Sequence, residues 1–215
     1  MNPANDCFPQ NQELEIRDLL VRDDGECILL DLEELDLPES PYRLYRFLTE
    51  VEDILAAEPA DERRIMAIAP LVRKLLISSY WLQLEFVRPN PNPGWSVRFL
   101  YQEHQFPLTV QMVAWLPGQP SPIHNHGTWG IVAVVNGQEK NRFWRKAPTA
   151  KHPHRIEPAG DRTLMPGDLI SFLPNAIHSV EPLGDEPAVT FNIYGVTDFQ
   201  QRFEFDPVKH TAKVF

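Results

Sequence analysis

The chain of 215 residues lacks several features that would assign a protein to a familiar class. It has only two cysteines, Cys7 and Cys27, too few for a disulfide framework. It has no apolar run near the ~18 residues that cross a bilayer, and its first residues lack the basic-then-apolar pattern of a signal peptide. These absences predict a soluble, cytoplasmic protein without a membrane partner.

Positive charge is also scarce. Lys and Arg together number 20 against 30 Asp and Glu, so the net charge is −10, and no basic run is present. Nucleic acids and anionic membranes bind proteins through clustered Lys and Arg, so the composition argues against both partners. The hydrophobic fraction of 43%, with five Trp and twelve Phe, predicts a folded domain with a substantial core.

Residues 1–80 carry mostly helical periodicity and predict a helical extension packed on the rest of the chain. Helices are expected over 12–23, from Ser40-Pro41 to about residue 55, and over 61–80, where Pro70 should kink or split the last one. The short apolar piece 27–30 fits either a strand or a helix.

Residues 81–215 change character around the turn-rich segment 89–94. A first strand is suggested by the alternation of 82–86. Further strands are predicted over 96–101, 108–116, 130–135, 138–145, 168–173 and 189–195. Short strands separated by Gly and Pro are typical of a β-sandwich or barrel.

The most informative stretch is Pro122-Ile123-His124-Asn125-His126-Gly127. Residues i and i+2 of a strand point to the same face, so His124 and His126 can offer two ligands to one transition metal. His178, after the Gly167-Asp168 turn and an apolar strand, is a third candidate. Together they predict a mononuclear metal pocket in a small β-barrel. His152 and His154 form a second i, i+2 pair, but their polar loop predicts solvated side chains.

The spacing of these histidines resembles the two motifs of the cupins. Gly118 with His124-x-His126 and Gly137 is similar to the first motif, and Gly167 with Pro174 and His178 is similar to the second. The resemblance implies a mainly β fold, a double-stranded β-barrel (jelly roll) that holds one metal, with the N-terminal helical extension added. The barrel domain would span 81–215.

More narrowly, the chain resembles the cysteine dioxygenase group of thiol dioxygenases. Two stretches around the histidines carry the resemblance: the His-x-His-x-x-Trp-Gly run of 124–130 and His178-Ser179-Val180-Glu181. Two further features are the segment 186–189 followed by Tyr194, and Arg98 within a Val-Arg-Phe-Leu-Tyr sequence. It covers about residues 81–205. It implies Fe(II) on His124, His126 and His178, Tyr194 beside the metal, Arg98 on a substrate carboxylate, and a small thiol and O2 as substrates.

The residues alone leave alternatives at each of these positions. Most cupins add a glutamate where this chain has Gly130, so the site resembles the all-histidine version, which by ligand type also permits Zn, Ni or Cu. Tyr194 could equally be an ordinary tyrosine of the barrel wall, and Arg98 could equally be an ordinary surface arginine on a strand. Trp115 and Trp129 are expected to pack the pocket wall.

The sequence departs from the thiol dioxygenase pattern at several positions. No cysteine follows the histidine pair, so no Cys–Tyr crosslink can form, and Asn192, Thr190 and Ser96 stand where the family has His, Ser and Tyr. Three hypotheses follow: an iron-dependent thiol dioxygenase that forms a sulfinate, another metal-dependent cupin oxygenase, and a cupin that binds a small molecule or metal without turnover.

Overall fold

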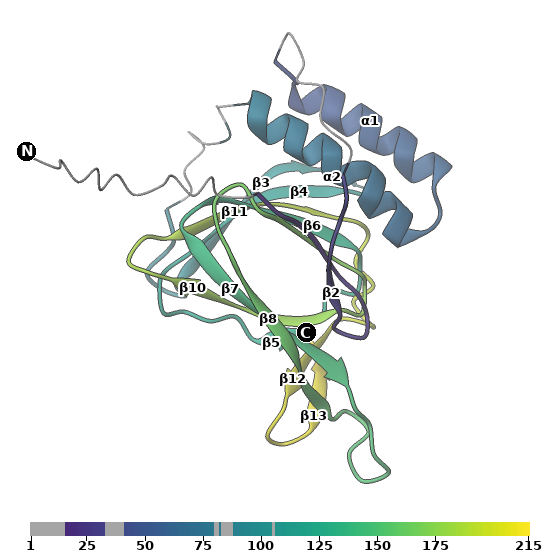
Figure 1. The fold of residues 1–215 in the computed structure, drawn as a ribbon, viewed down its shortest axis with the longest axis vertical. Coiled ribbons are helices and arrows are strands. Elements are labelled where there is room, and N and C mark those ends of the chain that lie inside the picture. The colour runs from purple at the N-terminus through teal and green to yellow at the C-terminus, as the bar shows by residue number, and fades with distance from the viewer. Residues whose placement is uncertain (1–15, 33–40, 80–81, 83–87, 105) are drawn as a thin grey trace, which may run out of the picture.

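The computed structural model describes residues 16–32, 41–79, 82, 88–104 and 106–215. The protein is mainly β: two sheets face each other around a barrel interior, and two helices lie outside one of them (Figure 1). The predicted double-stranded β-barrel with an added helical region is thereby confirmed. The predicted boundary between the two regions, at residues 80–81, falls outside the described residues.

The first sheet has seven strands. Its strands are antiparallel except for the parallel pair β1 and β9. In spatial order it contains β2 (Cys27–Leu29), β1 (Asp18–Val21), β9 (Leu169–Phe172), β6 (Gly130–Asn136), β11 (Ala188–Tyr194), β4 (Thr109–Trp115) and β3 (Trp95–Gln102).

The second sheet has six strands, all paired antiparallel. Five strands of this sheet were not predicted. One of them, β8, is exposed over most of its length and therefore carries no apolar alternation. In spatial order the sheet contains β13 (Thr211–Val214), β12 (Phe203–Asp206), β5 (Ile123–His124), β10 (Ile177–Leu183), β7 (Gln138–Lys146) and β8 (Ile156–Leu164).

The helices α1 (Leu44–Ala57) and α2 (Asp61–Ser78) cover the outer face of the first sheet, over β3, β4, β11 and β6 (Figure 1). Helix α1 begins at Leu44, after the predicted start at Ser40-Pro41, of which Ser40 lies outside the described residues. Helix α2 contains Pro70 and is not split into two helices there. Buried apolar residues of both helices and of this sheet form the main core. The helical extension is thus held by hydrophobic burial against the barrel.

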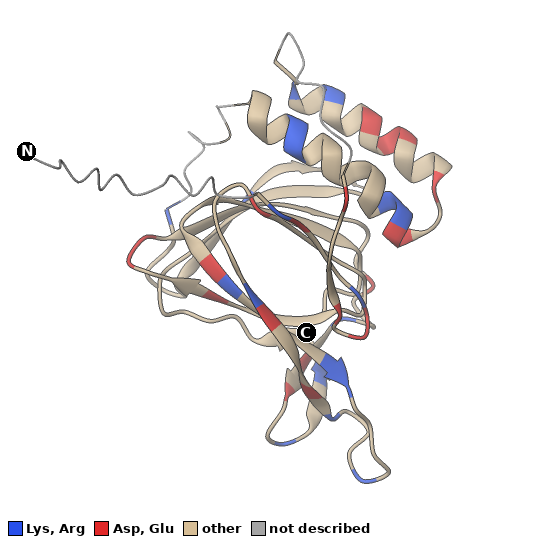
Figure 2. Cartoon of the chain, viewed as in Figure 1, with Lys and Arg blue, Asp and Glu red and all other residues tan. Residues whose placement is uncertain are grey.

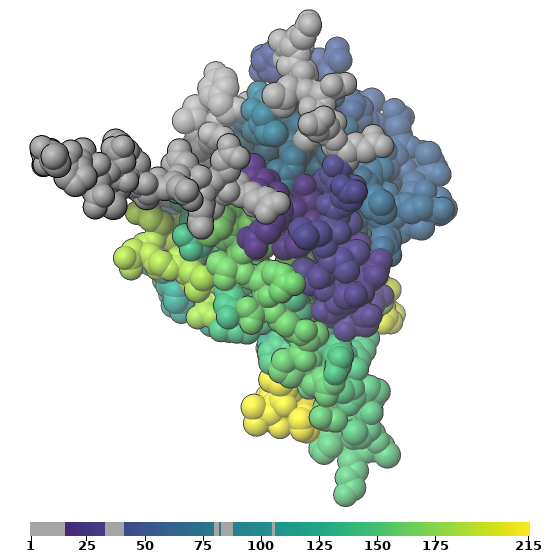
Figure 3. All heavy atoms as spheres, viewed as in Figure 1, coloured from purple at the N-terminus to yellow at the C-terminus, as the bar shows by residue number. Residues whose placement is uncertain are grey.

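The predicted helix over 12–23 is wrong where the structure describes it. Residues Asp18–Val21 form strand β1, which pairs with β2 and with β9, and Figure 3 shows this segment lying against the barrel. The carboxylate of Asp168, 3% exposed, anchors it by binding the Arg17 guanidinium at 2.5 Å. Leu19, Leu20 and Val21 are consecutive and all buried, which suits a strand covered on both faces.

The charged residues of the two helices are grouped by sign (Figure 2). In α1, Arg46 is followed by the acidic residues Glu50, Glu52 and Asp53, and α2 begins with Asp61 and Glu62 and carries Arg and Lys after them. Neither helix combines the length and the apolar character required to cross a membrane, as far as the chain is described.

Candidate metal centre

One antiparallel strand contact and the loop that follows it bring the three predicted histidines together. In β10, His178 pairs directly with His124 of β5, and His126 follows two residues later in the loop. Gly127 ends this turn with φ of +63°, and a Cβ there would lie 2.6 Å from the carbonyl oxygen of Asp198. The glycine after the histidine pair is therefore required by the backbone that presents His126.

The ring nitrogens are arranged so that the Nε2 atoms face one another. The Nδ1 atom of His124 lies 2.9 Å from the carbonyl oxygen of Pro122, and Nδ1 of His178 lies 2.9 Å from Oδ1 of Asn141. Each Nδ1 can thus donate its proton outward, which leaves Nε2 unprotonated. The Nε2 atoms of His126 and His178 are 2.9 Å apart, a distance comparable to that between two nitrogen ligands of one metal ion.

Burial keeps these imidazoles neutral. It lowers the pKa of His124 to about 4, and it lowers the pKa of His126 and His178 well below their usual value, with further lowering by neighbouring histidines. Neutral imidazole is the form that binds metals.

These three side chains form the one group of potential metal ligands found among the described residues, with all ligand atoms within 4.8 Å of one another. Three convergent, neutral imidazoles, of which His124 and His178 have oriented tautomers, fit a divalent transition metal. We therefore describe the site as a candidate three-histidine metal centre.

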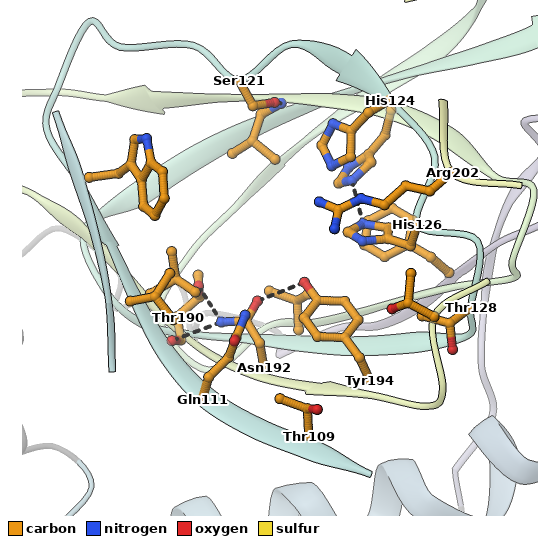
Figure 4. A pocket seen from close by; sticks show the side chains of 18 of the residues that line it. Thr109, Gln111, Ser121, His124, His126, Thr128, Thr190, Asn192, Tyr194 and Arg202 are labelled. Carbon is orange, nitrogen blue, oxygen red and sulfur yellow. Dashed lines mark hydrogen bonds between the residues drawn. The ribbon is translucent and has the colours of Figure 1, made fainter. Parts of the chain in front are cut away.

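Tyr194 lies beside this centre, as predicted from the resemblance. Its ring stacks on that of His126, with centroids 5.0 Å apart, and its hydroxyl donates to Oδ1 of Asn192 at 3.1 Å (Figure 4). Asn192 in turn donates to the hydroxyl and carbonyl oxygens of Thr190. A Cβ on Gly130 would lie 2.6 Å from the tyrosine ring, so glycine is what allows the ring to pack there.

Arg98 does not reach the centre. Along β3, Val97 and Phe99 line the cavity, so Arg98 belongs to the opposite face, where it pairs with Met112. Met112 belongs to the core beneath the helices. The structure therefore does not bring together Arg98 and the three histidines.

Another arginine does reach the cavity. Arg202, just before β12, extends its guanidinium toward His126, and its Cζ lies 4.5 Å from the centroid of Phe215 (Figure 4). Its Nε is buried and makes no hydrogen bond within the described part of the chain. Burial lowers the pKa of Arg202, but a guanidinium remains charged at neutral pH. No sequence motif singled out this residue, because it lies outside the two histidine motifs.

A buried polar pair supports His178 from behind. Asn141 accepts from His178 and donates through Nδ2 to Oε1 of Glu139 at 2.9 Å. Glu139 is 2% exposed, and desolvation raises its pKa to about 7. Both residues line the cavity from β7. Their contact with His178 depends on the pairing of β7 with β10, in which Asn141 is two residues from Phe143, the direct partner of His178, so the sequence does not predict it.

The remaining predicted residues lie elsewhere. His152 and His154 are exposed, as expected, in the loop between β7 and β8, where His152 contacts the ring of His210 at 4.7 Å between centroids. Trp115 lines the main cavity, whereas Trp129 lines a smaller cavity behind the His126 loop.

The histidines open into a cavity of about 420 Å³. Arg202 and the histidines lie toward one end, and Thr190 and Gln111 lie farther along it (Figure 4). The volume and the few converging polar groups are typical of a small-molecule site.

No protein-family model matches the chain. Solved structures similar to it include an oxalate oxidase bound to the substrate analogue glycolate, with 17% identity, a TM-score of 0.38, and coverage of 49% of this chain and 52% of that one. A cupin-2 domain from Rhodospirillum rubrum has 14% identity and a TM-score of 0.37, covering 48% and 60%. A double-stranded β-helix protein from Klebsiella pneumoniae has 18% identity and a TM-score of 0.41, covering 54% and 83%.

This chain therefore matches only about half of the oxalate oxidase, 52% of its length. At such low identity the function has to be argued from the residues of the site.

Proposed function

We propose that the protein is an Fe(II)-dependent thiol dioxygenase that converts a thiol carboxylate to its sulfinate. In this reaction both atoms of O2 are transferred to the sulfur, so RSH and O2 give RSO2H without an external reductant. The observation that carries the proposal is the three-histidine centre with a half-buried arginine and a tyrosine beside it. His124, His126 and His178 would hold the metal.

Because the three histidines are neutral, a divalent ion bound to them would keep its full charge. This charge favours the binding of an anionic thiolate over that of an uncharged substrate group. When bound, Fe(II) would supply the redox chemistry that allows O2 to react with sulfur. The three histidines present their unprotonated Nε2 atoms, two of them oriented by Pro122 and Asn141.

Arg202 takes the role of the carboxylate-binding residue in this proposal. Its guanidinium is in the cavity, its Nε lacks a hydrogen-bond partner among the described residues, and a carboxylate accepts bidentate bonds from such a group. Arg98, on the other face of β3, is not assigned this role.

Tyr194 positions the reacting atoms. Burial raises the pKa of its phenol, so the hydroxyl stays protonated, and Asn192 fixes the direction of the hydroxyl by accepting a hydrogen bond from it. The phenol oxygen retains a lone pair that can accept a hydrogen bond from a ligand in the cavity. Asn192 replaces the family histidine in holding this hydroxyl but cannot exchange protons as a histidine does.

The test is metal analysis with O2 consumption over a panel of thiols: cysteine, 3-mercaptopropionate, cysteamine and N-acylated cysteines. The proposal predicts bound iron and O2 uptake in one-to-one ratio with sulfinate, both lost in His126→Ala. The matched control is His152→Ala, which removes an exposed imidazole from a distant loop. Iron-loaded protein that consumes no O2 with any of these thiols would refute the proposal.

A second candidate is a different metal-dependent oxygenase built on the same histidines. Asn192, which stands where thiol dioxygenases have histidine, is the observation that favours it. This alternative predicts iron-dependent O2 uptake with a chelating carbon acid such as a diketone and none with thiols.

A further inference from the structure

The cavity beside the histidines is elongated. At one end Tyr194 of β11 pairs with Thr109 of β4, and six residues earlier along β11 Ala188 pairs with Trp115. At ~3.3 Å per residue this separation is about 20 Å along the sheet. Trp115 nevertheless lines the same cavity as His126 and Tyr194. The site therefore continues well beyond the atoms that the proposed chemistry needs.

The far end of this cavity is aromatic. Trp95 of β3 lies directly opposite Trp115 in the strand register, with ring centroids 6.0 Å apart. Val97 and Val113 form the next inward-facing pair along the same two strands. Trp95 is 41% exposed, so a large apolar side chain remains partly in water at the cavity wall. Burial of such a surface by a ligand is favourable.

The two ends differ in the chemistry that they offer. The histidine end provides a cationic guanidinium and metal ligands, whereas the tryptophan end is mainly apolar, with Thr190 beside Val113 as a polar residue. A cavity of about 420 Å³ lies in the size range of sites that enclose drug-sized ligands. A bare three-carbon thiol carboxylate would fill the first end and leave the second empty.

We propose that the substrate is an elongated amphiphile, with its thiol and carboxylate at the histidines and Arg202 and an apolar body extending along β3 and β4 to Trp95 and Trp115. The head group in this inference rests on the proposed function, whereas the apolar body rests on the cavity. The substrate class is therefore a thiol carboxylate that carries an acyl or alkyl chain.

The experiment compares N-acetylcysteine with N-octanoylcysteine, which share one head group and differ only in the apolar body. Calorimetric titration of zinc-loaded protein measures binding without turnover, and O2 uptake by iron-loaded protein measures kcat/KM. We expect the octanoyl compound to bind at least tenfold more tightly, since each added methylene removes apolar surface from water.

Trp115→Ala and Trp95→Ala should each reduce that preference to less than threefold, because they weaken the binding of N-octanoylcysteine far more than that of N-acetylcysteine. Trp95 is the safer position for folding because it is partly exposed. Tyr45→Ala is the matched control, since Tyr45 is an exposed aromatic on α1, 65% accessible and outside the cavity. Melting temperatures establish that each variant folds.

Equal affinity for the two compounds, or a chain-length preference that survives both tryptophan substitutions, would overturn the inference. O2 uptake with equal kcat/KM for both would also overturn it but would leave the proposed thiol dioxygenase intact. Tight, tryptophan-dependent binding of N-octanoylcysteine without O2 uptake would support the apolar subsite and refute the proposed reaction.

Discussion

The two faces of the first sheet have opposite compositions although the same strands build both. The outer face, under α1 and α2, carries fully buried apolar side chains, and the inner face carries most of the polar groups of the cavity. The outer residues of β4 and β11 are Val110, Met112, Ala114, Phe191 and Ile193. The inner polar residues of these two strands are Thr109, Gln111, Thr190, Asn192 and Tyr194, and Val113 and Trp115 of β4 also line the cavity.

Side chains of a strand alternate between its two faces, so neighbouring residues of one strand can serve the core and the cavity in turn. Phe191 contacts Phe47 of α1 with centroids 6.5 Å apart, while its neighbour Asn192 orients the tyrosine beside the histidines. Substitutions on the outer face should therefore change the free energy of unfolding, and substitutions on the inner face should change binding.

The largest expected effect is on the outer face. Phe191→Ala removes a fully buried ring between the sheet and α1 and should lower the free energy of unfolding by about 3–5 kcal/mol. Urea titration measures this loss. The folded variant should still bind one metal per chain, because Phe191 does not line the cavity. A variant that keeps its stability but loses metal would contradict the division between the two faces.

The next effect separates two arginines on opposite faces of the barrel wall. Arg202→Gln removes the guanidinium from the cavity and should raise KM for a thiol carboxylate about 100-fold, because a charge-assisted contact is lost. Arg98→Gln should leave KM within about twofold, since Arg98 lies outside the cavity. Cysteamine, which has no carboxylate, serves as the control substrate. The opposite ranking of the two variants would return the carboxylate role to Arg98.

A smaller effect concerns the pH dependence of stability. The pKa of Glu139 is raised from 4.5 to about 7 by burial, so the folded protein holds this proton more tightly than the unfolded chain does. The resulting stabilisation is fully present below pH 4.5 and is lost as the pH rises through 7, on the order of 3 kcal/mol over the whole shift.

Glu139→Gln removes this titration. Relative to the wild type, the variant should gain stability between pH 5 and pH 8, measured by urea unfolding of both metal-free proteins. The buried histidines shift stability in the opposite direction over part of this range, but they are common to both proteins and cancel in the difference. A constant difference between the two proteins at all pH values would show that Glu139 is not protonated in the folded state.

The smallest predicted effect is on metal affinity. Asn141→Leu removes the acceptor that holds Nδ1 of His178 and should weaken metal binding about tenfold without preventing it. Competition with a chromogenic chelator measures the affinity. The control is Asn136→Leu, which changes an exposed asparagine at the end of β6 whose side chain donates to the carbonyl oxygen of Pro187. Equal affinity of wild type and Asn141→Leu would remove Asn141 from the support of the centre.

The histidine centre was predictable because its signal is local. Two histidines at i and i+2 and a third after a Gly-Asp turn each place a side chain by short-range geometry, and the structure brings all three together. The predicted barrel strands were likewise supported by local alternation. The helix expected over 12–23 failed because Leu19 and Leu20 fit either period, and pairing with the distant β9 decided the outcome.

Arg98 and Arg202 show what local patterns leave open. The face of β3 on which Arg98 lies depends on its register with β4, which shifts between Phe99 and Tyr101. Arg202 enters the cavity only because the segment before β12 folds back beside β5. Likewise, the contact of Asn141 with His178 arises from the pairing of β7 with β10. Each of these placements is a tertiary contact between segments far apart in the chain.

Strand β5, only two residues long, is held between β10 and β12. His124 pairs with His178 on one side and with Glu204 of the C-terminal hairpin on the other. The hairpin is therefore paired directly with the strand that carries a candidate metal ligand. Occupancy of the centre should therefore protect the hairpin from trypsin, which cleaves after residues such as Arg202 and Lys209. The rate at which trypsin digests the C-terminal hairpin should therefore measure metal binding without any substrate.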